Sequence, residues 1–93
     1  MSFIIIDQVF IDEKFSKTIL TKTTDCDIVP SIGMEIEDSA WEKPKKIKRI
    51  QINPEHKYYK LFVEDEFITK RESFKITDIY KKCGWKFSNS ETK

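Results

Sequence analysis

The side chains that most often carry acid–base or nucleophilic chemistry are few and scattered in this sequence. The 93-residue chain has one histidine, His56, in a Pro-Glu-His-Lys turn that we expect to be exposed. A nucleophilic serine or cysteine usually needs a histidine beside it, and a zinc site needs ligands at fixed spacing. The two cysteines, Cys26 and Cys83, stand far apart without a Cys-x-x-Cys motif. Neither arrangement predicts a catalytic centre.

Two acidic triplets, residues 25–27 (Asp-Cys-Asp) and 64–66 (Glu-Asp-Glu), are the other places where metal ligands gather. Neither has the spacing of an EF-hand or a second ligand cluster nearby, so we interpret both as solvated loops. The carboxylate pair of a glycoside hydrolase includes an acid with a raised pKa in an apolar cleft, and a chain this short leaves little room for one. We therefore predict that the protein is not an enzyme and uses no metal ion or other cofactor.

One stretch combines positive charge with aromatic side chains. Residues 43–49 hold five cations in seven positions, and a predicted hairpin brings residues 57–62 back beside them. Basic and aromatic side chains interleaved on a small sheet are typical of OB-type modules that hold single-stranded nucleic acid. The candidate residues for such a contact are Lys46, Lys48, Arg49, Tyr58, Lys60 and Phe62. The alternative is a solvated, salt-bridged face, because lysine does not read base edges and neighbouring acids weaken the field.

The aromatic side chains also suit a protein-binding surface. In residues 57–64, Tyr58 and Phe62 alternate with Tyr59 and Leu61, so the two pairs lie on opposite faces of a strand. If one face stays uncovered, its aromatics mark a surface for a protein partner. Trp41, in a loop of charged residues, is a candidate anchor by the same logic. The alternative for Trp41 is a lid over one end of the core.

Charge is balanced overall but uneven along the chain. There are 17 basic and 16 acidic residues, which excludes a strongly basic nucleic-acid binder. Residues 1–42 hold three lysines against nine acids, whereas residues 43–93 hold fourteen basic residues against seven acids. One interpretation is cross-strand pairing within the fold, with Glu35 and Glu37 opposite Lys46 and Lys48. The other is a bipolar surface that meets an acidic partner or a second copy of the chain.

Composition favours a sheet, because the chain has 14 Ile, 3 Val and 7 Thr but only 2 Leu, 1 Ala and 2 Met. Ile47 is out of phase with Ile50 and Ile52, which predicts a bulge near Lys48 and Arg49. Asn53-Pro54-Glu55-His56 is typical of a hairpin turn. Strand patterns cover residues 3–11, 15–23, 28–37, 46–53, 57–64 and 67–70.

Apolar side chains recur at the spacing of one helix face near the C-terminus, at Ile76, Ile79, Tyr80 and Cys83. We place this helix at residues 74–83, with Gly84 as its C-terminal cap and Ser73 as its N-cap. A start at Thr69 would turn Phe74 away from the apolar stripe. Cys83 is expected to be a small buried hydrophobe.

These patterns predict a β-rich α+β fold: a small antiparallel sheet or SH3-like barrel of five or six strands, with one C-terminal helix. We expect a single domain over residues 1–87, with Trp85 and Phe87 folded onto the core, and a disordered tail over 88–93. The apolar run 3–6 is too short for a signal peptide or a membrane span, and the isolated cysteines suit reduced thiols in the cytoplasm.

The leading hypothesis for function is a non-enzymatic protein-binding module, such as an inhibitor, an immunity-type protein or an adaptor, that docks a rigid β surface on a protein partner. The alternatives are a weak single-strand nucleic-acid-binding domain and a self-assembling structural subunit. No membrane contact and no small-molecule cofactor are expected.

Overall fold

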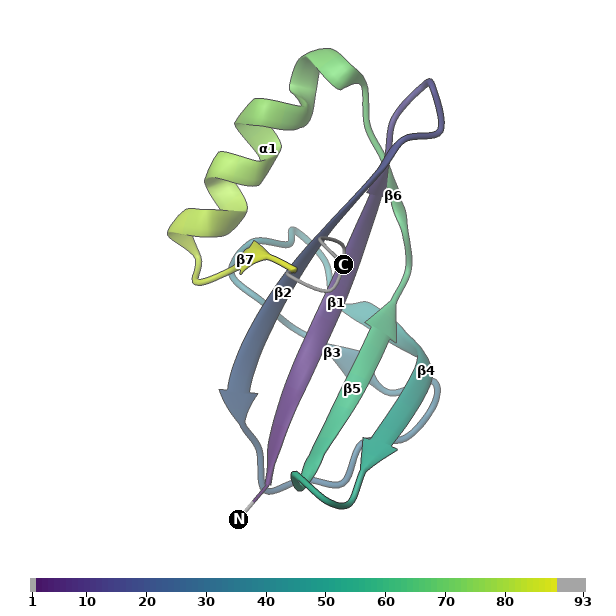
Figure 1. Ribbon diagram of the computed structural model, residues 1–93, viewed down its shortest axis with the longest axis vertical. Coiled ribbons are helices and arrows are strands. Elements are labelled where there is room, and N and C mark those ends of the chain that lie inside the picture. The colour runs from purple at the N-terminus through teal and green to yellow at the C-terminus, as the bar shows by residue number, and fades with distance from the viewer. Residues whose placement is uncertain (1, 89–93) are drawn as a thin grey trace.

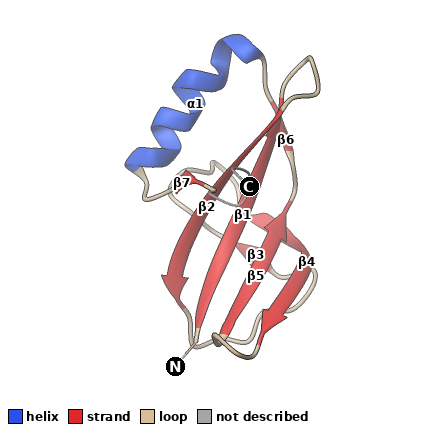
Figure 2. Ribbon diagram, viewed as in Figure 1, coloured by secondary structure: helices blue, strands red, loops and turns tan. Residues whose placement is uncertain are grey.

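Strands dominate the computed structural model, which describes residues 2–88 (Figures 1 and 2). Three long strands, β1, β2 and β4, have nine residues each, whereas β3, β6 and β7 have two. In chain order the elements are β1 (Phe3–Ile11), β2 (Lys17–Asp25), β3 (Glu35–Ile36), β4 (Lys45–Asn53), β5 (Tyr58–Val63), β6 (Glu66–Phe67), α1 (Lys70–Lys82) and β7 (Lys86–Phe87).

The seven strands form one curled half-barrel sheet in the order β3-β4-β5-β1-β2-β7, with β6 also paired to β1. The long strand β1 lies in the middle of this order, as expected for a strand with apolar residues on both faces. The described edges are the two-residue strands β3 and β7. The predicted fold class, a β-rich α+β fold with one helix near the C-terminus, is confirmed.

Two strand pairings are parallel, which the sequence did not predict. Strand β1 pairs with β5 in parallel, Phe3 opposite Tyr58 and Asp7 opposite Phe62, and it pairs with β6 in the same sense. The remaining pairings are antiparallel, as predicted. The cause is the long connection of residues 26–44, which crosses behind the sheet between the two hairpins and so allows β1 and β5 to run in the same direction (Figure 1).

The predicted bulge in β4 is confirmed. Ile47 pairs with Val63 and Arg49 pairs with Phe62, which leaves Lys48 as the extra residue. Ile47 is 2% exposed, whereas Lys48 and Arg49 are both exposed. The bulge therefore turns two consecutive cations away from the core.

The helix begins four residues earlier than predicted. Thr69 is its N-cap: the Thr69 hydroxyl accepts from the Glu72 N–H at 3.1 Å, and the Glu72 carboxylate accepts from the Thr69 N–H at 3.2 Å. The Glu13 carboxylate, from the β1–β2 turn, accepts from the Lys70 N–H at 2.6 Å. Three N–H groups at the start of the helix thereby gain side-chain acceptors, which outweighs the 84% exposure of Phe74 that the earlier start entails.

The core lies between the sheet and α1. Trp41 and Trp85 are 9% and 2% exposed, with ring centroids 5.7 Å apart, and Tyr80 of α1 packs edge-on against Phe10 at 5.0 Å. Trp85 folds onto the core as predicted. Phe87 does not: it is 46% exposed, because β7 places it at the sheet edge with Lys81 over its ring.

The C-terminal end of the described chain continues along β2. The Ser88 N–H donates to the Ile19 carbonyl at 3.0 Å. The rest of the segment predicted as a tail, residues 89–93, lies outside the described residues. Within residues 2–88, no helix has the length and apolar character needed to cross a membrane.

Candidate functional site

The sheet has one covered face and one uncovered face. Along β1, the alternate residues Ile4, Ile6, Gln8 and Phe10 are all buried, and α1 and Trp41 pack on their side of the sheet. We call this the inner face. The opposite face of β1, β2 and β5 is turned to the viewer in Figure 1, where no helix or described loop lies over it. We call this the outer face.

Strand register defines the residues of the outer face. They are Phe3, Ile5, Asp7 and Val9 of β1, Ile19, Thr21 and Thr23 of β2, Tyr58, Lys60 and Phe62 of β5, and Arg49 and Gln51 of β4. Most of the apolar members are half-buried by their neighbours alone. A sheet face in contact with water is usually polar, so this apolar and aromatic content marks the outer face as unusual.

Cations lie against aromatic rings on this face. The Arg49 guanidinium is 4.0 Å from the centroid of the Phe62 ring, and the Lys60 ammonium is 5.8 Å from the same ring. The Phe3 and Tyr58 rings are 5.3 Å apart. These contacts hold the aromatic rings in fixed orientations, which reduces the entropy lost when a ligand binds them.

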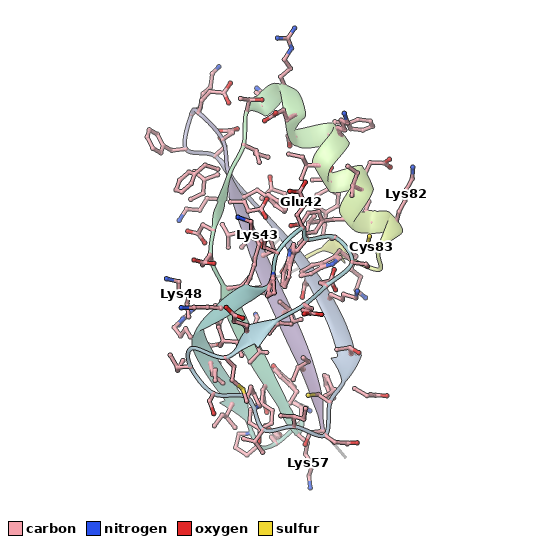
Figure 3. All side chains as sticks on the ribbon, turned by 180° about the vertical axis from the view of Figure 1, so that it is seen from behind. Glu42, Lys43, Lys48, Lys57, Lys82 and Cys83 are labelled. Atoms are coloured by element: carbon pink, nitrogen blue, oxygen red, sulfur yellow. The ribbon has the colours of Figure 1, made fainter. Side chains whose placement is uncertain are left out.

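The structure brings the predicted basic and aromatic residues to the same side of the sheet. Strand alternation and the β4 bulge place all six there: Lys46, Lys48, Arg49, Tyr58, Lys60 and Phe62. Lys46 lies opposite Glu35, the cross-strand pair that the sequence predicts. Lys48 is free to project from β4 (Figure 3).

Trp41 is separate from this group. It packs in the core beneath α1, with the Lys45 ammonium 5.2 Å from its ring, so its structure matches the alternative of a lid over the core. The other half of the expected charge pairing, Glu37 opposite Lys48, is wrong, because the antiparallel register that sets Glu35 opposite Lys46 and Ile36 opposite Lys45 leads Glu37 away from Lys48.

Asp7 lies at the middle of the outer face and is unusual for its position. It is 6% exposed, and it faces Phe62 on one side and Thr21 on the other. One carboxylate oxygen is 3.5 Å from the Lys60 ammonium. The other oxygen and the Thr21 hydroxyl are buried, and neither has a hydrogen-bond partner. A buried polar atom without a partner is costly, so Asp7 and Thr21 are two under-satisfied polar positions just beneath the middle of the outer face.

A polar network on the inner face holds the helix to the sheet. The Lys45 ammonium donates to Gln8 Oε1 at 2.6 Å and pairs with Glu66, whose carboxylate accepts from the Tyr80 hydroxyl at 3.3 Å. Burial and the nearby Glu66 charge raise the pKa of Tyr80 above its ordinary value of 10.0. A groove of about 610 Å³ opens beside this network, between α1 and residues 40–45. Because its charged groups are paired with each other, the network is structural.

A second inner-face network centres on Asp38. Its carboxylate accepts from Lys22 at 2.6 Å, from the Ala40 N–H at 2.9 Å and from the Trp85 indole at 3.0 Å. Burial opposes ionisation, but these three hydrogen bonds outweigh it and lower the pKa of Asp38 below its ordinary value of 3.8. Asp38 thereby ties the loop that carries Trp41 to β2 and to Trp85.

The residues considered for chemistry stay apart. His56 is exposed in the β4–β5 turn, and the half-buried thiols of Cys26 and Cys83 are both free. Cys83 packs at the margin of the core and is less buried than predicted. Across residues 2–88, no three histidine, cysteine or acidic side chains gather as a metal site would require.

Asp7 and Phe3, which contribute most to the outer face beyond the predicted residues, were not among the predicted site residues. A signal for Asp7 was present: it is the one acid within Phe3–Ile11, directly after three isoleucines. Its position opposite Phe62 and within 3.5 Å of Lys60 depends on the parallel pairing of β1 with β5, which no local pattern encodes. Comparisons with protein-family models, curated proteins and solved structures find no match to this chain.

Proposed function

We propose that this protein is a non-enzymatic protein-binding module that docks its outer face on a partner protein. The observation that carries the proposal is the buried Asp7 at the middle of an uncovered aromatic face. Fixed aromatic rings provide contact area at low entropic cost, and the unpaired oxygen of Asp7 gives the face a polar anchor. Because this oxygen is buried, the Phe62 or Lys60 side chain beside it must shift on docking, and the partner then supplies an N–H donor from an arginine, a lysine or a backbone amide.

The charge of Asp7 favours protein over nucleic acid as the ligand. A phosphate backbone crossing the face would meet a carboxylate that already has the Lys60 ammonium 3.5 Å from it. The remaining cations on this side, Lys46, Lys48 and Arg49, lie on β4. A partner with donors for Asp7 and apolar groups for Phe3 and Phe62 meets no such repulsion.

The test compares two phenylalanines of different environment. Phe62 lies on the outer face, and Phe74 is 84% exposed on the far side of α1, so Phe74→Ala is a matched control for Phe62→Ala. Tagged wild type and both variants are used to recover partners from a native lysate of the source organism. We expect the same protein with wild type and Phe74→Ala, and at least tenfold less of it with Phe62→Ala. Equal recovery by all three forms, or no protein above the bead background, would contradict the proposal.

Single-stranded nucleic acid is a second candidate ligand, supported by the six basic and aromatic residues gathered on one side of the sheet. Asp7→Asn separates the two candidates. Loss of the negative charge should strengthen binding of an oligothymidylate if nucleic acid is the ligand, and should weaken binding of the recovered protein if protein is the ligand. The titration is made at low salt, where phosphate contacts are strongest.

A further inference from the structure

We infer that the free edge of β4 binds an extended segment of a partner protein in which acidic and apolar residues alternate. This edge adjoins the outer face, with which it shares Arg49 and Gln51, but the proposal rests on its backbone groups and does not depend on the proposed function. The geometry that supports it is the mismatch in length between β4, with nine residues, and its neighbour β3, with two.

Pairing along the outer edge of β4 stops part-way. Strand β3 pairs with Lys45 and Lys46, and the Ile47 backbone bonds to Met34 and Gly33 at 2.9 Å each. From Lys48 to Asn53, no described residue pairs with the edge that faces away from β5. The edge therefore offers a row of backbone N–H and C=O groups to an added strand.

The reason that β3 stops is local. Gly33 has a φ of +90°, and the Met34 N–H bonds back to Ser31 in a tight turn. This turn takes the chain away from β4 after Ile47. The rest of the β4 edge thus stays open while β5 holds it in a fixed, extended register.

The chain's own β3 shows what this edge accepts. Glu35 lies opposite Lys46 on the outer side, and Ile36 packs against the core on the inner side. The bulge interrupts this alternation at Lys48, but the free edge still has cations on one side and an apolar residue on the other. The cations Lys48 and Arg49 lie on the outer side, and Ile52, which is 66% exposed, lies on the inner side. An added strand with acids on its outer side and apolar residues on its inner side would complement both the cations and Ile52.

The same charges disfavour a second copy of this chain as the occupant. Two β4 edges brought together would bring two sets of Lys48 and Arg49 into one ribbon, with no acid in residues 48–53 of either copy. The other long strand near an edge, β2, is paired by β7 at Leu20 and Thr21. The one other apolar residue of β2, Ile19, is half-buried, and its carbonyl accepts from the Ser88 N–H.

The test uses a capped seven-residue peptide of alternating glutamate and valine, titrated into the 15N-labelled protein. We expect saturable shifts and slowed amide exchange at residues 49–53. The control peptide has the same sequence with alternate backbone nitrogens methylated, which removes strand hydrogen bonds and keeps the charge. It should bind at least tenfold more weakly. Equal binding of the two peptides, absence of saturation, or shifts confined to β1, β2 and β5 would overturn the proposal.

Variants identify the edge. Lys48→Glu should weaken the affinity for the peptide about fivefold, because a favourable cross-strand pair becomes a like-charge pair. Lys14→Glu, at the β1–β2 turn, should leave the affinity unchanged. Asp7→Asn should bind the peptide as wild type does, so failure of the outer-face proposal would not affect this result. An equal loss with Lys14→Glu would show non-specific charge attraction. A free protein that is dimeric, with residues 49–53 protected before peptide is added, would make a second copy the occupant and overturn the proposal.

Discussion

The inner and outer faces of the sheet are built from similar residues but have different environments. On the inner face, Phe10, Leu20 and Leu61 are each no more than 1% exposed beneath α1 and the two tryptophans. On the outer face, Phe3 and Phe62 remain half-buried with no element over them. Aromatic and β-branched residues therefore fill both faces of β1, and only one face is sealed by the chain itself.

The contrast separates stability from binding. Burial of apolar area contributes about 25 cal/mol per Å², so the sealed inner face contributes most of the free energy of folding. Outer-face side chains gain less from folding and retain area that a partner can still bury. The two faces also differ in their polar groups: the carboxylate of Asp38 has three hydrogen-bond donors, whereas one oxygen of Asp7 has none.

The largest expected effect contrasts two phenylalanines. Phe10→Ala should lower the free energy of unfolding by about 4 kcal/mol, because it opens a cavity beneath Tyr80. Phe62→Ala should lower it by about 1 kcal/mol, because the ring is half-exposed. Urea denaturation measures both values. Equal losses of unfolding free energy in the two variants would show that the outer face belongs to the core, and would contradict the difference between the two faces.

Asp38 supplies the next largest effect. Asp38→Asn should cost about 2 kcal/mol, because charge-assisted hydrogen bonds to the Lys22 and Trp85 side chains are weakened. Since folding lowers the pKa of Asp38, the contribution is present above pH 3.8 and is lost as the pH falls through the lower, folded-state pKa. The midpoint of urea denaturation, measured between pH 2 and 6, should fall more steeply in wild type than in Asp38→Asn. Parallel curves would contradict this assignment.

The helix cap gives a smaller effect. Thr69→Ala removes the hydroxyl that accepts from the Glu72 N–H and should cost about 1 kcal/mol. Thr69→Ser retains the acceptor and should cost less than half as much. Thermal unfolding followed by circular dichroism compares the two. If Thr69→Ala has no effect, the helix does not begin at Lys70.

Asp7 is expected to have the smallest effect on stability. Asp7→Asn should change the free energy of unfolding by less than about 1 kcal/mol, because one oxygen has no partner to lose and Lys60 can turn to water. Urea denaturation at neutral pH provides the value. A loss above about 3 kcal/mol would indicate a buried ion pair that stabilises the fold, and Asp7 would then belong to the structural networks of the inner face.

Local patterns in the sequence account for the elements whose contacts are local. The alternation in Phe3–Ile11 and the phase shift at Ile47 predict β1 and the bulge, because strand period and register are properties of neighbouring residues. The helix start was predicted wrongly, because the exposed Phe74 was weighed above the cap at Thr69. A cap supported by Glu13, more than fifty residues away, is not visible in a local window.

Only the part of the outer face that depends on local alternation was predicted from the sequence. Tyr58, Lys60 and Phe62 share a face by simple alternation, which the sequence shows. The arrival of Asp7 beside Phe62 requires a parallel pair between residues 55 positions apart, and Trp41 reaches the core through a long connection. Pairings of this kind depend on packing of the whole chain, so composition and spacing do not reveal them.

The most direct test of the central claim places a photo-crosslinking benzoylphenylalanine at position 62, and separately at position 74. Each protein is mixed with a native lysate and irradiated. Docking through the outer face predicts one discrete protein adduct from position 62 and none from position 74. The same adducts from both positions, or an adduct from position 62 that a nuclease removes, would contradict the claim that this face binds a protein.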